Sequence, residues 1–327
     1  MGILGAMLRR SAGLAILLLL AGCSVVSVDL TPPIRPLEET TVEGRGTAKV
    51  LLLDISGVLS DEAVTPILTL GSPPARVPLL VRIREELKKA EEDSAVRALV
   101  VRINSPGGTV TASDIVYREL ELFRQRTGMP LVAALMDVAA SGGYYVALAT
   151  DKIMAHPTTV TGSIGTIMIN VNAEGLMHKI GVAATTIKSG EHKDMGSPFR
   201  SLTDEERKIF QSVIDDLHRQ FVAKVVERRR LAADAARRLA DGRVFTAEQA
   251  LAHGLIDSLG YMPDALALAR QAAGVSEARV IVYRRPRQYR ATYYARADSP
   301  GTGIESSVSQ LAALAAPGPR FLYLWWP

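Results

Sequence analysis

Residues 98–108 read Ala-Leu-Val-Val-Arg-Ile-Asn-Ser-Pro-Gly-Gly, a run of mostly apolar residues that ends in a Pro-Gly-Gly turn. A nearly continuous apolar run of this length predicts a buried strand, and the proline and glycines predict where it ends. Amphipathic helical patterns flank it, over residues 77–92 before the strand and up to about residue 126 after it. A strand between two helices predicts βαβ units on a parallel sheet.

The same alternation continues outward in both directions. Further apolar runs predict strands at residues 50–55, 131–136 and 152–155. Residues 142–149 form an apolar stretch that predicts a buried helix. Thr203 and Glu206 have the spacing of a capping box, which predicts a long helix that ends near residue 230. We therefore expect an α/β fold in which helices cover a parallel sheet.

The N-terminus has the pattern of a targeting signal. Two arginines at positions 9 and 10 precede an apolar run that is too short to span a bilayer as a permanent helix. The run ends in Leu-Ala-Gly-Cys23, which resembles the bacterial lipobox, and Cys23 is the only cysteine in the chain. We therefore predict that residues 1–22 are a lipoprotein signal peptide and that Cys23 is lipidated. A simple signal peptide or anchor with a chance cysteine is the alternative.

Composition divides the remaining chain into three parts. Residues 23–46 are rich in proline and acidic side chains and predict an extended tether. Residues 47–275 contain the strand and helix patterns and predict a folded domain of one large core or two small ones. Residues 276–327 predict a basic and aromatic C-terminal extension.

The C-terminal extension begins with interleaved arginines and tyrosines and ends in Phe-Leu-Tyr-Leu-Trp-Trp-Pro. Arginine and tyrosine together can bind single-stranded nucleic acid. However, the net charge of +4 falls to +2 without the two signal arginines, and an exported protein seldom meets nucleic acid. We expect a solvated tail or an inter-subunit arm, and no nucleic-acid partner. The apolar residues 321–327 are expected to dock in the groove of a neighbouring subunit; the membrane interface and a disordered tail are the alternatives.

A candidate nucleophile lies in Ala-Ala-Ser141-Gly142-Gly143. Ser141 follows a predicted strand and precedes a predicted helix, so the Gly142 amide would lie in the partial positive charge of a helix N-terminus. A serine hydroxyl is a poor nucleophile until a base removes its proton. Taken alone, the motif also fits an ordinary helix N-cap.

A second glycine pair, Gly107 and Gly108, follows the strand at residues 98–103. In open α/β sheets, ligands bind beyond the carboxyl ends of the strands, and glycine lets backbone amides point outward. Donors of this kind stabilise the oxyanion of a tetrahedral intermediate by about 3–4 kcal/mol each. The pair therefore indicates acyl transfer, with an ordinary strand-to-helix turn as the alternative.

The catalytic base is a less evident choice. None of the five histidines has an aspartate partner in a motif, whereas Ser-Gly-Glu-His-Lys193-Asp places a lysine in a predicted loop. A free lysine has a pKa near 10.4, and burial can lower the pKa of such an amine into the neutral range. Lys193 is therefore a candidate base, although most lysines are solvated surface charges. We expect neither a metal ion nor a cofactor.

Together these motifs resemble those of the signal peptide peptidase A family of Ser-Lys proteases, which shares its fold with ClpP and the crotonases. The resemblance covers about residues 50–257. It rests on residues 104–109, 140–145, 161–165, 189–193 and 243–247. It implies ClpP/crotonase-like repeated ββα units with a parallel sheet and outer helices, and a protease domain at residues 47–275.

The family pattern also implies roles for single residues. Ser141 would be the nucleophile, Lys193 the general base, and Ser163 a hydrogen-bond partner of the lysine amine. The amides of Gly108 and Gly142 would form the oxyanion hole. Relatives of this size form rings, so the resemblance implies a homo-oligomer in which a neighbouring subunit completes each site.

We therefore expect a serine endopeptidase, lipid-anchored on the periplasmic side of a bacterial cell envelope, that cleaves extended peptides such as remnant signal peptides or envelope proteins. A non-catalytic envelope lipoprotein scaffold of the same fold is the alternative, but a scaffold need not retain Ser141, Lys193 and Ser163 together. A crotonase-like acyl-CoA enzyme would fit the fold, but the export signal contradicts it.

Overall fold

The fold is seen in a computed structural model that describes residues 35–61, 77–286, 292–294 and 320–325. All of these belong to one unit of the chain. The predicted signal peptide at residues 1–22 and the predicted lipidation site at Cys23 lie outside the described residues.

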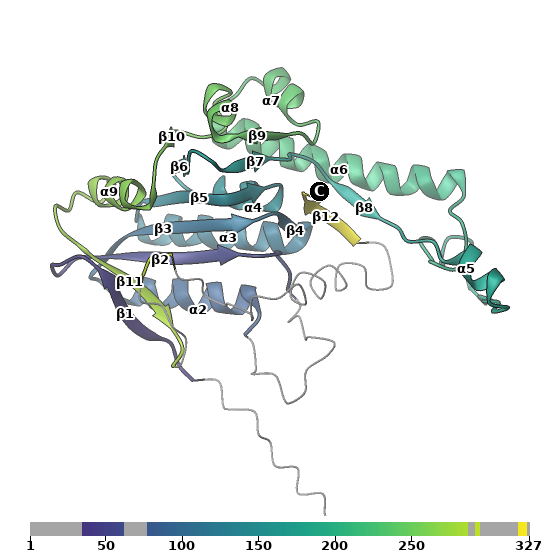
Figure 1. Ribbon diagram of the computed structural model, residues 1–327, viewed down its shortest axis with the longest axis horizontal. Coiled ribbons are helices and arrows are strands. Elements are labelled where there is room, and N and C mark those ends of the chain that lie inside the picture. The colour runs from purple at the N-terminus through teal and green to yellow at the C-terminus, as the bar shows by residue number, and fades with distance from the viewer. Residues whose placement is uncertain (1–34, 62–76, 287–291, 295–319, 326–327) are drawn as a thin grey trace, which may run out of the picture. The chain divides into compact units, whose positions relative to one another are not determined.

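Strands and helices alternate along the chain (Figure 1). The first elements are β1 (Glu38–Glu43), β2 (Lys49–Ser56), α2 (Leu79–Glu92), β3 (Val96–Ser105), β4 (Gly107–Thr109) and α3 (Val110–Thr127). They are followed by β5 (Leu131–Ala140), α4 (Gly142–Ala147), β6 (Lys152–Ala155), β7 (Val160–Gly162), β8 (Ile167–Ile169), α5 (Glu174–Lys179) and α6 (Asp204–Arg229). The last are α7 (Ala233–Leu239), β9 (Val244–Thr246), α8 (Ala247–Ala252), β10 (Ser258–Leu259), α9 (Met262–Ala272), β11 (Arg279–Arg284) and β12 (Arg320–Leu324).

The main sheet joins nine strands of the described residues. Seven follow the order β1-β11-β2-β3-β5-β6-β10, while β7 pairs with β5 and β9 pairs with β7. The pairs from β11–β2 to β6–β10, and the pair β5–β7, are parallel. Only β1 and β9 run antiparallel to their neighbours in this sheet. The predicted α/β fold with a mostly parallel sheet is therefore confirmed.

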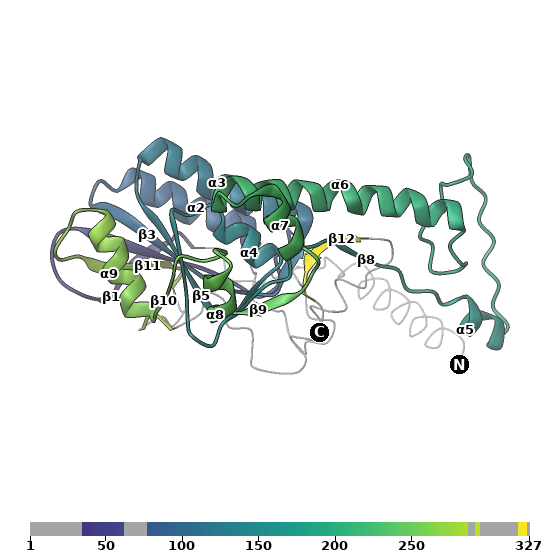
Figure 2. The same cartoon turned by 90° about the horizontal axis from the view of Figure 1, so that it is seen from above.

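The sheet is buried between two apolar layers, because successive residues of a strand point to opposite faces. On one face, Leu51 and Leu99 pack with buried residues of α2, α3 and α4. On the other face, Val50 and Val100 pack with α9. Figure 2 shows α2 and α3 on one side of the sheet and α9 on the other. Burial on both faces explains why the central strands are nearly continuous apolar runs.

Two segments that were predicted to lie outside the folded domain contribute strands to the main sheet. The tether predicted for residues 23–46 includes β1, and the extension predicted for residues 276–327 includes β11, which pairs with both β1 and β2. The side chains of Val280, Ile281 and Val282 are buried. Apolar residues between arginines here form a strand of the main sheet, and not a solvated tail or arm. The folded domain therefore includes β1 and β11.

A second sheet, in the order β4-β12-β8, brings the C-terminal tail back to the Pro-Gly-Gly turn. The strand β12 is antiparallel to both neighbours, with Tyr323 opposite Gly108 and Leu322 opposite Ile167. The Trp325 amide also donates to the Pro106 carbonyl at 2.8 Å. The prediction that the tail docks on protein is confirmed for its described part. It docks on its own chain, and not on a neighbouring subunit as expected.

The chain leaves the main sheet after β7, passes through β8 of the second sheet and returns through α6. The C-terminal half of α6 packs in the core through Phe221 and Val225. Its N-terminal half extends beyond the sheet, on the side of α5 (Figures 1 and 2). Thr203 and Glu206 form the predicted capping box at its start. We call residues 170–203, which connect β8 with α6, the arm.

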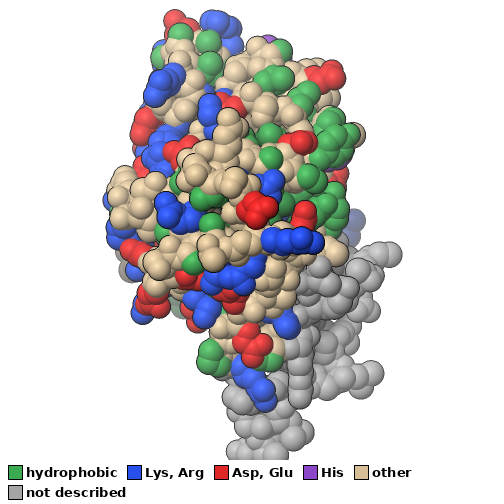
Figure 3. Space-filling view, turned by 90° about the vertical axis from the view of Figure 1, so that its left-hand side faces the viewer, with side chains coloured by type: hydrophobic (Ala, Val, Ile, Leu, Met, Phe, Trp, Pro, Cys, Tyr) green, Lys and Arg blue, Asp and Glu red, His purple; other side chains and the backbone are tan. Residues whose placement is uncertain are grey.

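The surface seen in Figure 3 carries acidic and basic side chains intermingled, without a patch of one sign. This is the end of the molecule that lies at the left of Figure 1. Within the described ranges, none of the helices is both long enough and apolar enough to cross a membrane.

Candidate active site

Ser141 stands at the junction between β5 and α4. Its φ of 51° lies in the left-handed region, which a non-glycine residue adopts at a cost and which is typical of functional turns. The residue is only 1% exposed, and its Oγ atom has no hydrogen-bond partner among the described residues. A buried hydroxyl without a partner is costly in a merely structural role. This geometry favours a nucleophile over an ordinary N-cap; indeed, Ser141 makes no side-chain cap bond to α4.

Ser163 lies beside Ser141 because β5 and β7 are parallel neighbours. The register pairs Ala140 with Gly162, so the two serines follow at the same end of adjacent strands. The Ser141 amide donates to the Gly162 carbonyl at 2.7 Å. Ser163 has a φ of 50° and is 7% exposed. The structure therefore brings these two predicted site residues together.

The Pro-Gly-Gly turn presents the Gly108 amide on one edge of β4. On the opposite edge, the Gly107 carbonyl and the Thr109 amide bond to Leu59 at 2.8 and 2.9 Å. The Gly107 amide donates to the Ser105 hydroxyl at 3.1 Å. Because successive residues of a strand point their backbone groups to alternate edges, the Gly108 amide faces β12. This orientation suits an oxyanion donor.

Gly142 begins α4, so its amide has no acceptor within the helix. The glycine is required by close packing. A Cβ atom at this position would lie 2.3 Å from the Ser113 hydroxyl oxygen, and one at Gly143 would lie 2.6 Å from the Ser105 carbonyl oxygen. The turn after Ser141 is therefore held against β3 and α3, with its first amide at the positive end of a short helix.

The carbonyl group of Tyr323 lies between the two glycine turns. A Cβ atom built on Gly107 would be 1.9 Å from the Tyr323 carbonyl oxygen and 2.7 Å from the Gly142 amide nitrogen. One built on Gly142 would be 3.0 Å from the same oxygen. The tail thus places a peptide carbonyl where the Gly107–Gly108 turn and the start of α4 meet. Such an arrangement can polarise a carbonyl for attack by a serine.

The side chain of Tyr323 fills an aromatic pocket. Its ring centroid lies 5.3 Å from that of Tyr145 and 4.8 Å from that of Phe221, and Tyr117 lies 5.3 Å from Tyr145. Its hydroxyl donates to the Leu217 carbonyl at 2.8 Å. Burial raises the pKa of Tyr323, so the phenol stays neutral. The pocket accepts an aromatic ring with one polar group at its tip.

Lys193 lies in the arm, and the structure does not join it to the serines. Its side chain is exposed, while the Ser141 hydroxyl is buried and has no hydrogen-bond partner within the described part of the chain. The nearby Lys188 is occupied: its Nζ contacts Asp194 Oδ1 and the Glu191 carbonyl, both at 2.7 Å. Within one chain, the structure brings together the predicted nucleophile Ser141, Ser163 and the two glycines predicted to form the oxyanion hole, but not the predicted base.

Sequence reasoning missed two parts of this site. Gly107, with a φ of 103°, makes the close approach to Gly142, although only Gly108 was assigned a role. The apolar run Ile-Met-Ile of β8 pairs with the edge of β12 that faces away from β4; we call the space between β4 and β8, which β12 fills, the groove. Its position just after the Thr-Gly-Ser163-Ile-Gly motif was the available signal. Over the described ranges, no three His, Cys, Asp or Glu side chains are placed to hold a metal ion.

Comparison with known proteins identifies a family for the segment that holds these residues. A family model described as peptidase family S49 matches residues 124–276, a segment that contains Ser141, Ser163 and Lys193. The putative signal peptide peptidase SppA of Enterococcus faecium is 35% identical over 247 residues, which are 76% of this chain and 70% of that protein.

Other relatives match a shorter part of the chain. A putative protease of Synechocystis is 43% identical over 192 residues, 59% of this chain and 69% of that protein. Protease 4 of Salmonella typhi is 34% identical over 192 residues, which are 59% of this chain and 31% of that protein.

Among solved structures, a ClpP1 mutant from Listeria monocytogenes matches 66% of this chain and 94% of that chain, with a TM-score of 0.42 and 16% sequence identity. The family assignment rests on the relatives, which match at 34–43% identity, and on the family model. The resemblance inferred from the motifs is thereby confirmed. The chain belongs to peptidase family S49, together with SppA and protease 4, and is a protease.

Proposed function

We propose that the chain is a serine endopeptidase in which Ser141 is the nucleophile and Lys193 of a neighbouring copy is the general base. The observation that carries the proposal is the buried Ser141 hydroxyl, which has no hydrogen-bond partner among the described residues and stands at a groove that holds a peptide carbonyl. Lys193 is exposed on the arm of the same chain, where a second copy can meet it. A base supplied in trans accounts for both facts.

The reaction would proceed in two steps. In the first, Lys193 takes the Ser141 proton as Oγ bonds to the scissile carbonyl carbon, and the oxyanion is stabilised by the Gly108 and Gly142 amides. The lysine then gives that proton to the leaving amine as the C–N bond breaks. In the second step, a water molecule activated by the same lysine releases the acyl group and restores Ser141. Ser163, beside the nucleophile, would hydrogen-bond the lysine amine and orient it.

The substrate would bind as an extended strand between β4 and β8. The tail already occupies this place in antiparallel register with both strands. Addition of a strand gives affinity through main-chain hydrogen bonds and specificity through pockets for alternate side chains. The Tyr323 carbonyl lies at the glycine turns, so its aromatic pocket would receive the residue before the scissile bond. Remnant signal peptides and unfolded envelope proteins offer such apolar, extended segments.

We further propose that the enzyme is anchored by lipid at Cys23 on the periplasmic side of a bacterial envelope. The support is the lipobox-like sequence and the absence of any other cysteine. One acyl chain anchors only marginally, so stable attachment requires several chains. Cys23→Ser should release the protein from membranes or leave its precursor uncleaved. An unmodified mature N-terminus elsewhere, found by mass spectrometry, would contradict the lipid anchor.

A fluorophosphonate probe tests the nucleophile directly. The probe should label the wild-type protein at Ser141, and Ser141→Ala should abolish labelling. Lys193→Ala should slow labelling strongly, whereas His192→Ala, a change of the adjacent residue, should leave most of it. Loss of labelling with His192→Ala but not with Lys193→Ala would overturn the assignment of the base.

A further inference from the structure

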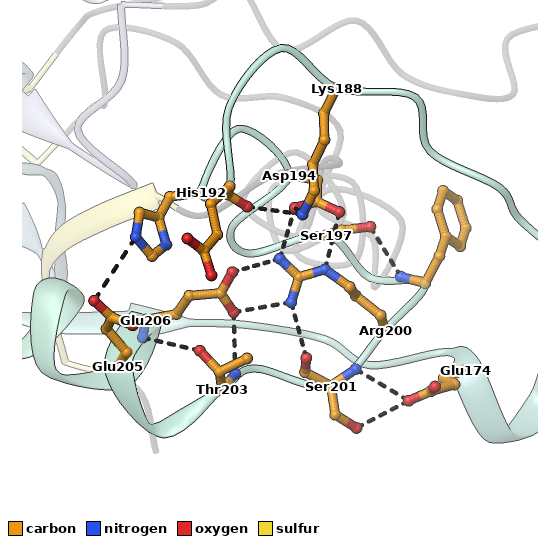
Figure 4. A network of polar contacts seen from close by, with 12 residues as sticks. Glu174, Lys188, His192, Asp194, Ser197, Arg200, Ser201, Thr203, Glu205 and Glu206 are labelled. Atoms are coloured by element: carbon orange, nitrogen blue, oxygen red, sulfur yellow. Dashed lines mark hydrogen bonds and ion pairs between the residues drawn. The ribbon is translucent and has the colours of Figure 1, made fainter.

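One arginine ties the turn that carries Lys193 to the start of α6 (Figure 4). The Arg200 guanidinium donates from Nε to Asp194 Oδ2 at 3.0 Å and from Nη2 to Asp194 Oδ1 at 2.7 Å. It also donates from Nη1 to Glu206 Oε2 at 2.8 Å, from Nη2 to Glu206 Oε1, and from Nη1 to the Ser201 carbonyl at 3.0 Å. A planar guanidinium suits two carboxylates in this way, and an ammonium group does not.

The Asp194 end of this contact controls the position of Lys193. The two residues are adjacent in a tight turn, in which the Lys193 amide donates to the Gly190 carbonyl at 3.2 Å and the Ser197 amide to the Asp194 carbonyl at 3.0 Å. Lys188 binds the same carboxylate from the other side at 2.7 Å. The two cations keep the Asp194 carboxyl ionised by holding its pKa well below its usual range.

The Glu206 end connects the turn to the protein core. Glu206 is 2% exposed and also accepts from the Thr203 amide at 3.0 Å, as part of the capping box of α6. That helix has 26 residues, or a length of about 39 Å, and its far half is anchored in the core through Phe221. A rigid connection therefore runs from the core through α6, Glu206 and Arg200 to the turn of Lys193.

We propose that Arg200 is a positioning residue for Lys193: by clamping Asp194 to Glu206, it fixes the height and direction at which the arm presents the lysine to the Ser141 of a neighbouring copy. This inference rests on the proposed function. An exposed arm has few apolar contacts of its own, and its placement depends on such polar clamps. A displacement of about 1 Å in a catalytic group can lower turnover by about 10²-fold.

Arg200→Gln should therefore lower kcat by about 10–100-fold, with KM for a peptide nearly unchanged, because the groove between β4 and β8 is untouched. Arg200→Lys should be intermediate, since an ammonium group cannot hold both carboxylates in the same geometry. Arg237→Gln is the matched control: Arg237 pairs with Asp234 at 2.9 Å on the exposed face of α7, and its loss should leave kcat unchanged. An Arg200→Gln enzyme with wild-type kcat would overturn the proposal.

A mixing experiment separates positioning of the lysine from general damage. Copies with Ser141→Ala and copies with Lys193→Ala should together restore activity at mixed contacts, where one supplies the lysine and the other the serine. Arg200→Gln should lower the restored activity by the same factor of about 10–100 when it is placed in the Ser141→Ala copy, which supplies Lys193. In the Lys193→Ala copy, which supplies Ser141, it should have little effect. Equal losses from both placements would show a structural role and refute the proposal.

The design also distinguishes the inference from the proposed function. A Lys193→Ala enzyme that keeps its activity would refute the proposed base itself. If Lys193→Ala is inactive but Arg200→Gln is not, only the positioning role of Arg200 fails. If the mixture shows no activity, the lysine acts within its own chain; the kcat of Arg200→Gln, with KM and the Arg237→Gln control, then still decides the inference.

Discussion

The groove and the arm of this protease are built in opposite ways. The groove is part of the sheet: Ser141, Ser163 and Gly142 follow directly from buried strands and are themselves buried, and their backbone positions are fixed by packing. The arm has no such support. Its turn around Lys193 is exposed and is held by a few charged side chains attached to the end of a helix.

Under the proposed function, this contrast would make one chain only part of an enzyme. An oxyanion hole needs donors fixed to within a fraction of an ångström, and close-packed strands and a helix N-terminus provide that rigidity. A base delivered by a neighbour needs an element that reaches beyond its own core, and an exposed arm provides the reach. The proposed function therefore divides the labour between copies, so that activity would depend on assembly into the predicted homo-oligomeric ring.

The largest expected effect tests this division directly. Ser141→Ala and Lys193→Ala should each lower peptidase turnover by at least about 10³-fold, because the pair acts as a unit. In a closed ring assembled from equal amounts of both variants, about a quarter of the contacts should join an intact serine to an intact lysine and recover activity. Turnover of a fluorogenic peptide measures the recovery.

The assembly itself provides the control for this mixture. The active wild-type protein should have a ring mass by light scattering, and dilution below the assembly threshold should remove its activity. A fully active monomer would show that Lys193 reaches Ser141 of its own chain. The contrast between groove and arm would then describe a resting conformation and not a division between copies.

A smaller effect should follow from a change inside the groove. Ser163→Ala should lower kcat by about 10–100-fold, because Ser163 orients the base and does not itself react. Thr161→Val, on β7 just before Ser163, is a control for local packing, since its hydroxyl donates to the Ala139 carbonyl at 2.6 Å. A Ser163→Ala enzyme with full turnover would contradict this role and would show that the arm alone orients the lysine.

The groove was largely predictable from sequence, because its residues are adjacent to strong local signals. Gly107, Gly108, Ser141 and Ser163 each follow a buried strand, and parallel strands end at the same edge of the sheet. The paired glycines indicate backbone amides that point outward, although the close approach of Gly107 to Gly142 does not follow from the sequence. Functional residues that directly follow a strand can be predicted from sequence in this way.

The rest was not predictable, because it depends on long-range pairing. Nothing local shows that β11 lies between β1 and β2, since Val280 and Ile281 are flanked by arginines that also fit a solvated tail. The return of Tyr323 to Gly108 depends on a contact across the whole domain. The clamp of Arg200 on Asp194 and Glu206 lies within 12 residues of sequence, but charges at that spacing are common on solvated surfaces.

A still smaller effect is expected when the C-terminal tail is removed from the groove. Deletion of residues 320–327 should lower KM for peptides by about 3–10-fold at unchanged kcat, because a tethered strand competes with substrate at a high effective concentration. Tyr323→Ala in the full chain should produce much of the same change, since it removes the ring packed on Tyr145 and Phe221. Steady-state kinetics would detect it. An unchanged KM in both variants would mean that peptides bind elsewhere.

The smallest effect concerns pH. It distinguishes the arm, which is held by charged side chains, from the groove, which is held by apolar packing. The hydrogen bonds of Arg200, followed by that of the Thr203 amide, lower the pKa of Glu206 from its ordinary 4.5 to about 2. A lowered pKa stabilises the fold above pH 4.5, and this stabilisation is lost as the pH falls from about 4.5 towards 2. Amides at the start of α6 should therefore lose hydrogen-exchange protection, corrected for intrinsic rates, over this range, while apolar packing keeps β5 protected. Arg200→Gln should remove this pH dependence, because the amides at the start of α6 would then already be unprotected at pH 6. If β5 and the start of α6 lost protection together in the wild type, groove and arm would form one cooperative unit, and the arm could not move separately to meet its neighbour.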